Sequence, residues 1–80
     1  MTREEVFERL TDVFRTVFDD EDIVLNDDTT AEDIEDWDSL MHITLISEVE
    51  DEFDVHFAMK DVTGMQNVGE MASLILEQVD

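Results

Sequence analysis

Proline is absent from the 80 residues, and glycine occurs only at Gly64 and Gly69. Both residue types mark turns, so a chain with almost none of them favours long helices over many short strands. Eighty residues allow no more than one small core, because a chain of this length buries only about 60% of its unfolded surface. The sequence therefore predicts an all-α fold in a single domain, residues 1–80.

A first amphipathic segment begins close to the N-terminus. Thr2 is a suitable N-cap, and Glu5 three residues later completes the pattern of a capping box. Apolar side chains then recur at helical spacing to about Phe18: Val6, Phe7, Leu10, Val13, Phe14, Val17 and Phe18. This periodicity predicts a helix with one face in the core.

Acidic residues and threonines replace this periodicity from Asp19 to Asp38. We interpret the segment as a long loop, and loops of this length usually have a functional reason. Its apolar residues are expected to pin it to the core: Ile23, Val24, Leu25, Ile34 and Trp37.

A second helix is expected to begin at Asp38 or Ser39. At about 100° per residue, one broad face collects six side chains that should point to the core: His42, Ile43, Leu45, Ile46, Val49 and Phe53. Four side chains lie on the opposite face, which should point to partners: Met41, Thr44, Glu48 and Asp51.

The remainder of the chain predicts one or two further helices. A short turn of helix has room around Met59 to Val62. Asn67 is then a suitable N-cap, with Glu70 three residues later. A last apolar stripe follows: Val68, Met71, Leu74, Ile75 and Val79. The expected architecture is a small three-to-four-helix bundle with a long loop between the first and second helices.

The charge of the chain limits its partners. Twenty-four acidic residues stand against four basic ones, for a formal net charge of −20. This charge repels nucleic acid and anionic membranes, so the expected partners are basic protein surfaces. Like-charge repulsion also favours a monomer. The chain has neither an apolar signal core at its N-terminus nor an apolar run that approaches a membrane span, and we expect a cytoplasmic protein without membrane insertion.

Two acidic clusters in the loop, residues 19–22 and 26–28, raise the question of calcium. An EF-hand loop needs a glycine at its sixth position, and neither cluster has one. Cysteine is also absent, so the chain has no disulfide, no thiolate metal ligand and no thiol nucleophile of its own. No metal site is expected, and any thioester chemistry would need a thiol from a cofactor.

Asp38-Ser39-Leu40 stands where the acidic loop gives way to the second helix, with Trp37 before it and Phe53-Asp54-Val55 closing the helix. This arrangement resembles the attachment motif of the acyl carrier protein family, and the resemblance covers nearly the whole chain. It implies that a phosphopantetheinyl transferase attaches 4′-phosphopantetheine from coenzyme A to Ser39. Asp38 and Leu40 would help to present Ser39, and the thiol of the arm would carry acyl groups as thioesters.

The chemistry of a helix N-terminus suits this interpretation. Free amides and the positive end of the macrodipole would favour a phosphodiester on Ser39. Aspartate and serine are also common helix caps. Both interpretations hold together if Asp38 caps the helix while the Ser39 hydroxyl points outward.

His42, three residues after Ser39, suggests the serine and histidine pair of a hydrolase. The chain has no Gly-x-Ser-x-Gly turn and no glycine-rich oxyanion loop, and it is too small to exclude water from a cleft. We therefore expect a carrier module with no catalytic residue. His42 is interpreted as half-buried, packed near Trp37 and hydrogen-bonded to the loop, and His56 as exposed.

The resemblance also implies an acidic docking face around the second helix. The candidate residues here are Glu35, Asp36, Met41, Thr44, Glu48 and Asp51. Met41 and Thr44 make this face less acidic than in general fatty-acid carriers, so we expect a specialised discrete carrier. Its partners would be an acyl-activating ligase or acyltransferase and synthase enzymes with basic docking surfaces, in a lipid, polyketide or related biosynthetic pathway.

In carriers that enclose their cargo, the cavity lies between the second and third helices. It maps here onto Ile46, Val49, Phe57, Val62 and Met65, although these side chains also read as ordinary core. Phe57 and Met65 are bulky, so we expect a small or shallow cavity and a short or exposed acyl group.

An alternative function is an unmodified acidic interaction protein, such as an inhibitor or a nucleic-acid mimic that acts through its negative surface. The two functions differ in their dependence on one hydroxyl. Ser39→Ala should abolish a carrier, whereas a charge mimic should tolerate the change.

Overall fold

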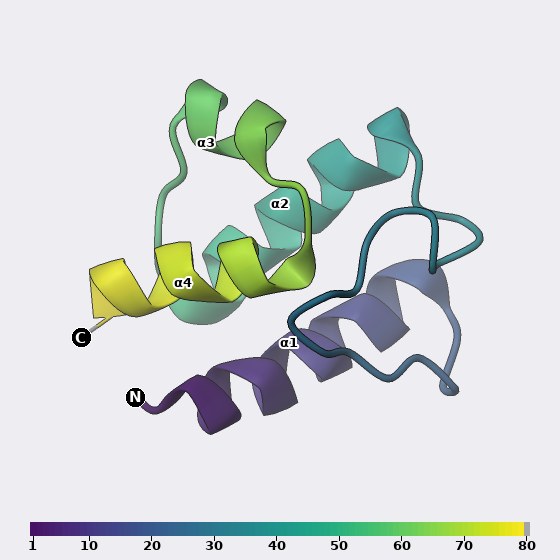
Figure 1. The fold of residues 1–80 in the computed structure, drawn as a ribbon, viewed down its shortest axis with the longest axis horizontal. Helices are drawn as coiled ribbons and strands as arrows, with labels where there is room; N and C mark the ends of the chain where they lie inside the picture. Colours follow the sequence, from purple (N-terminus) through teal and green to yellow (C-terminus); the bar gives the residue numbers. More distant parts are fainter. Residues whose placement is uncertain (80) are drawn as a thin grey trace.

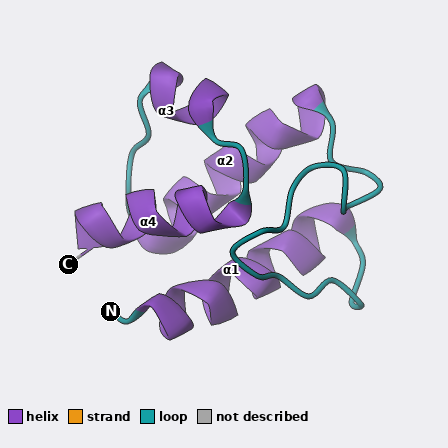
Figure 2. Cartoon of the chain, viewed as in Figure 1, coloured by secondary structure: helices purple, strands orange, loops and turns teal. Residues whose placement is uncertain are grey.

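The computed structural model describes residues 1–79, which form four helices and no strand (Figures 1 and 2). The helices are α1 (Arg3–Phe18), α2 (Ser39–Phe53), α3 (Met59–Gly64) and α4 (Val68–Val79). A loop of residues 19–38 joins α1 to α2. The all-α bundle with its long first connection confirms the predicted fold, and the short helix α3 is present.

The start of α2 lies at one end of the molecule, away from the start of α1 and the end of α4 (Figure 1). Figure 1 shows α2 and α4 running in the opposite direction to α1, so that α1 begins and α4 ends at the other end of the long axis. This axis is 31 Å long.

The capping box predicted for α1 is present. Glu5 N donates to Thr2 Oγ1 at 3.1 Å, and Thr2 N donates to Glu5 Oε1 at 3.4 Å. The apolar stripe that follows is buried at five positions: Val6, Leu10, Val13, Phe14 and Phe18. The helix ends at Phe18, and its C-cap Asp19 takes the left-handed conformation with φ 50°. Aspartate tolerates this conformation better than most residues, because its short polar side chain bonds locally.

The core-facing stripe of α2 differs from the prediction at Ile43. Leu45, Ile46, Val49 and Phe53 are buried, but the side chain of Ile43 is 61% exposed. Ile43 stands at the edge of the stripe, and it faces a cleft between α2 and α3. The prediction that Ile43 points to the core is therefore wrong.

The long loop is pinned to the core by three buried apolar residues, Ile23, Ile34 and Trp37, and Leu25 is half-buried against the core. The prediction for Val24 is wrong, because its side chain is 76% exposed. Neighbouring side chains of an extended segment point to opposite sides, so Ile23 and Leu25 turn Val24 toward solvent.

The loop also completes the N-terminus of α4. Val68 N donates to Thr29 O at 2.8 Å, and Gly69 N donates to Asp27 O at 3.1 Å. The first amides of a helix have no hydrogen-bond partner within the helix. Here two loop carbonyls accept hydrogen bonds from two of these amides. The predicted cap is present as well, with Glu70 N donating to Asn67 Oδ1 at 2.9 Å.

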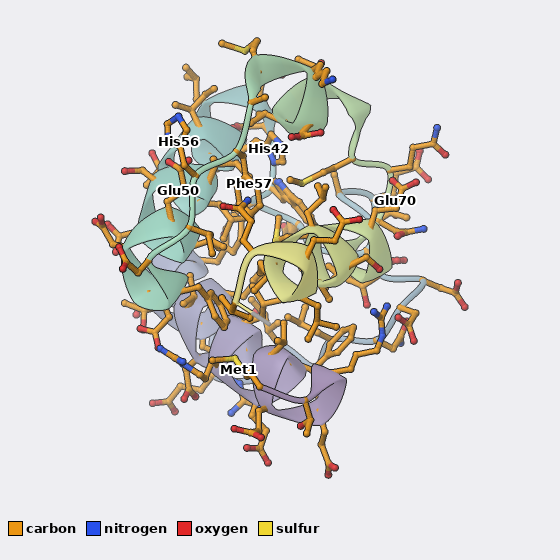
Figure 3. The ribbon with its side chains drawn as sticks, turned by 90° about the vertical axis from the view of Figure 1, so that its left-hand side faces the viewer. Met1, His42, Glu50, His56, Phe57 and Glu70 are labelled. Carbon is orange, nitrogen blue, oxygen red and sulfur yellow. The ribbon has the colours of Figure 1, made fainter. Side chains whose placement is uncertain are left out.

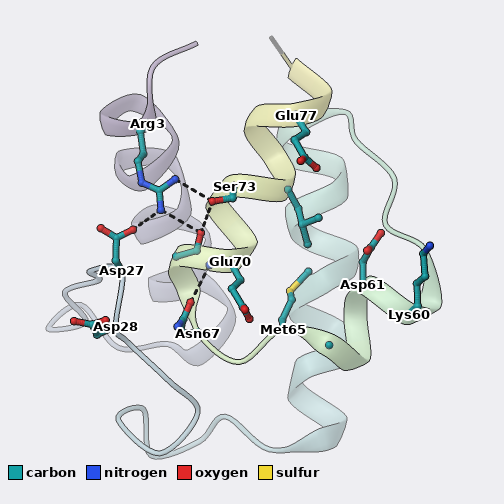
Figure 4. Close-up of a pocket in the computed structure, with 13 residues that line it drawn as sticks. Arg3, Asp27, Asp28, Lys60, Asp61, Met65, Asn67, Glu70, Ser73 and Glu77 are labelled. Atoms are coloured by element: carbon teal, nitrogen blue, oxygen red, sulfur yellow. Dashed lines mark hydrogen bonds and ion pairs between the residues drawn. The ribbon is translucent and has the colours of Figure 1, made fainter.

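Arg3 connects the start of α1 to this junction. Its guanidinium pairs with Asp27 and donates to Gly69 O and Ser73 Oγ, both at 3.2 Å (Figure 4). One side chain thus ties together α1, the loop and α4.

Candidate functional site

Ser39 is the first residue of α2, and Asp38 is the N-cap. The Asp38 carboxylate accepts a hydrogen bond from Met41 N at 2.9 Å. Capping is thus performed by Asp38, and Ser39 is exposed beside it. The side chain of Leu40 is also exposed, at 81%. The local fold therefore presents a primary hydroxyl to solvent at the N-terminus of a 15-residue helix.

This position suits an attached phosphodiester. The first intrahelical hydrogen bond runs from His42 N to Asp38 O at 2.8 Å, so the amides before it have no partner within the helix. These amides and the positive end of the macrodipole favour negative charge next to Ser39. No side chain has to move to make room, because Ser39 is exposed.

A cleft of about 420 Å³ opens beside Ser39, between the start of α2, α3 and the start of α4. Ser39, Ile43, Val62 and Met65 are among the residues that line it. Of the five residues predicted to line an acyl pocket, Val62 and Met65 therefore lie at the cleft. The other three are buried in the core and do not line it: Ile46, Val49 and Phe57.

Trp37 closes the edge of the core immediately before Asp38. Its ring packs edge-on against Phe14, with centroids 5.2 Å apart and planes at 84°. The His42 ring stacks on the indole at 5.8 Å, and Trp37 Nε1 donates to His42 Nδ1 at 3.0 Å. This confirms the predicted setting of His42, half-buried against Trp37 and bonded to the loop.

His42 has a second partner that the sequence did not indicate. Its Nε2 lies 3.2 Å from the carbonyl oxygen of Val62, in α3. Because Nδ1 accepts from the indole, the ring hydrogen resides on Nε2 and is donated to Val62 O. Figure 3 shows His42 between α2 and α3, and His56 on the outside of the molecule. Both His42 nitrogens are thus engaged in structural hydrogen bonds.

The predicted docking residues are spread over the loop and α2. Glu35 and Asp36 are exposed before the helix, and three residues are exposed along it: Thr44, Glu48 and Asp51. Met41 departs from this group because it is half-buried against the core. The exposed apolar side chains near Ser39 are instead Leu40, Ile43 and Met59. Sequence periodicity did not reveal this set, because it depends on where α3 lies.

Two findings concern other kinds of site. Within residues 1–79, no three His, Cys, Asp or Glu side chains come together in a way that could hold a metal ion. None of the four helices in this range is long and apolar enough to cross a membrane.

Comparisons with known proteins agree on one family. A family model described as "Phosphopantetheine attachment site" matches residues 8–75. The solution structure of the holo acyl carrier protein from Geobacter metallireducens is similar to this chain, with 40% sequence identity and a TM-score of 0.87. The match covers 92% of this chain and 85% of that one. No curated protein sequence matches the chain.

Proposed function

The chain belongs to the acyl carrier protein family, and on this premise we propose that Ser39 is the residue to which its 4′-phosphopantetheine is attached. Members of the family are carrier modules without catalytic activity of their own, so this protein is a carrier and not an enzyme. The observation that carries the proposal is the exposed Ser39 hydroxyl, which begins α2 at the mouth of a cleft.

Three neighbouring residues have separate tasks in this proposal. Ser39 Oγ forms the phosphodiester bond. Asp38 holds the first turn of α2 in place through its cap to Met41 N. The exposed side chain of Leu40 offers the transferase an apolar contact next to the reacting hydroxyl. The attached arm supplies a thiol, which the chain lacks, and this thiol carries acyl groups as thioesters.

The partners are a phosphopantetheinyl transferase and the biosynthetic enzymes that load and use the acyl group. Exposed acids flank Ser39 along the loop and α2, and they favour fast, transient docking on basic enzyme surfaces. Near Ser39 the surface is apolar, with Leu40, Ile43 and Met59 exposed. This surface supports a specialised carrier in a lipid, polyketide or related pathway. The family match does not favour the alternative of an unmodified charge mimic.

The test is the intact mass after incubation with coenzyme A, magnesium and a phosphopantetheinyl transferase of broad specificity. We expect one phosphopantetheine-sized gain on the wild type and none on Ser39→Ala. Ser47→Ala is the matched control, since it removes another exposed serine hydroxyl from α2, and it should be modified like the wild type. A gain on Ser39→Ala, or no gain on a folded wild type with several transferases, contradicts the proposal.

A further inference from the structure

Helix α3 is held in place by few interactions. It has six residues, and none of them is buried. Among residues 1–79, a single hydrogen bond joins α3 to another helix, from His42 Nε2 to Val62 O at 3.2 Å. Its apolar contact with the core comes from the half-buried side chain of Val62. The position of α3 therefore depends strongly on His42.

His42 is itself fixed from the core side. Trp37 is buried, packs against Phe14 and donates its indole hydrogen to His42 Nδ1. With the two rings stacked, His42 Nε2 points to Val62. A continuous connection thus runs from the aromatic core through the imidazole to the backbone of α3.

The same elements form the cleft beside Ser39. His42 and Ser39 line it from α2, and Met59, Val62 and Thr63 line it from α3. A movement of α3 away from α2 would widen the cleft, because the two helices form facing walls.

We propose that His42 is a positioning residue that holds α3 against the first turn of α2 through its hydrogen bond to the Val62 carbonyl, and so sets the width of the cleft beside Ser39. We call this contact from His42 to α3 the clasp. The clasp is inferred from geometry alone, whereas its consequence for the arm and its cargo rests on the proposed function. A narrow cleft keeps the acyl group at the surface, and an open one exposes the apolar wall of α3 to it.

The clasp uses both ring nitrogens of His42, because Nδ1 accepts from the Trp37 indole and Nε2 donates to Val62 O. Asp38 is the other titratable side chain that lines the cleft. The charged residues of α3, Lys60 and Asp61, line a separate hollow with Arg3 and Glu70 (Figure 4).

The first test measures amide hydrogen exchange on the unmodified protein. In His42→Ala the amides of α3 should exchange about fivefold faster, as expected for a lost hydrogen bond worth about 1 kcal/mol. Exchange in α1 should stay unchanged. His42→Gln should restore protection, because its carboxamide offers one acceptor and one donor. His56→Ala, which removes the exposed histidine, is the matched control and should have no effect. Wild-type exchange of α3 in His42→Ala overturns the proposal.

The second test uses the wild type, so that it holds even if His42→Ala does not fold. Trp37 is the single tryptophan and gives one indole N–H signal by NMR. In the wild type, NMR of the His42 ring nitrogens should find the hydrogen on Nε2, and the indole N–H should be protected from exchange by its bond to Nδ1. His42→Gln should keep this protection, because glutamine also offers an acceptor, and His56→Ala should leave it unchanged. A His42 ring hydrogen on Nδ1 instead of Nε2 contradicts the clasp.

These outcomes are independent of the attachment chemistry. The exchange and NMR tests need neither the transferase nor the arm, so failure to modify Ser39 would leave them intact. Conversely, folded His42→Ala should still gain the phosphopantetheine mass, because Ser39 and its Asp38 cap are untouched.

Discussion

At Gly69, the backbone of the long loop lies directly against α4. It is buried, and its amide donates to Asp27 O at 3.1 Å. A Cβ atom built at Gly69 would lie 2.7 Å from that backbone oxygen. Real Cβ atoms do not come so close, so any side chain here must push the loop and the helix apart.

We therefore predict that Gly69→Ala lowers the free energy of unfolding by roughly 1–3 kcal/mol, the usual cost of overpacking. Urea unfolding followed by circular dichroism measures it. Gly64→Ala is the matched control, because nothing lies within 4 Å of a Cβ at that position, which is the last residue of α3. It should leave stability unchanged or raise it slightly. Equal losses in the two variants would show that the approach of Asp27 is not the cause.

The start of α2 has one capping hydrogen bond, which Met41 N donates to the Asp38 carboxylate. We predict that Asp38→Ala destabilises the protein by about 1 kcal/mol, the usual value of an N-cap. Asp38→Asn should retain most of the stability, because asparagine caps equally well. Asp36→Ala removes the same charge from an exposed site and should cost nothing. Thermal unfolding of the three variants decides the point, and a loss of equal size in Asp36→Ala would assign the effect to charge instead.

The beginnings of three helices could be predicted from the sequence because their caps are local. Thr2 with Glu5, Asp38, and Asn67 with Glu70 each lie within three residues of the amide that they satisfy. Periodicity likewise identified most of the core. These signals depend on a single helix and its first turn, so no knowledge of the tertiary structure was needed.

The remaining features depend on how the elements pack. Val24 is exposed because Ile23 and Leu25 on either side turn inward, and Ile43 because α3 leaves a cleft beside it. The bond from His42 to Val62 spans 20 residues, and its acceptor is a backbone carbonyl, which every residue type has. No residue pattern could have indicated it. The attachment role of Ser39 and the docking and pocket residues stay predictions for experiment.

At the scale of the whole molecule, the net charge of −20 acts over a body of 31 × 25 × 22 Å. In about 0.01 M salt the Debye length is about 30 Å, so charges on opposite sides repel one another. In about 0.15 M salt it falls to about 8 Å, and repulsion is limited to near neighbours. The folded state brings these charges together, so screening should favour it.

We predict that raising sodium chloride over this range increases the melting temperature. A gain of about 1 kcal/mol corresponds to roughly 4–8 °C for a chain of this size, and differential scanning calorimetry measures it. Glu8→Gln with Asp12→Asn is the comparison, since it removes two exposed like charges four residues apart on α1. This double variant should melt higher in low salt and respond less to added salt. A melting temperature that is independent of salt in both proteins would refute the role of repulsion.

The placement of the chain ends has a practical consequence. The start of α1 and the end of α4 lie at one end of the long axis, and the start of α2 lies at the other (Figure 1). A tag or tether that extends the chain before α1 or after α4 therefore leaves the Ser39 end free. The protein can therefore be immobilised on a sensor surface through either terminus with its modifiable end facing the solution. Binding enzymes would meet the same orientation in both formats, and any difference in their measured affinity would report on the tether.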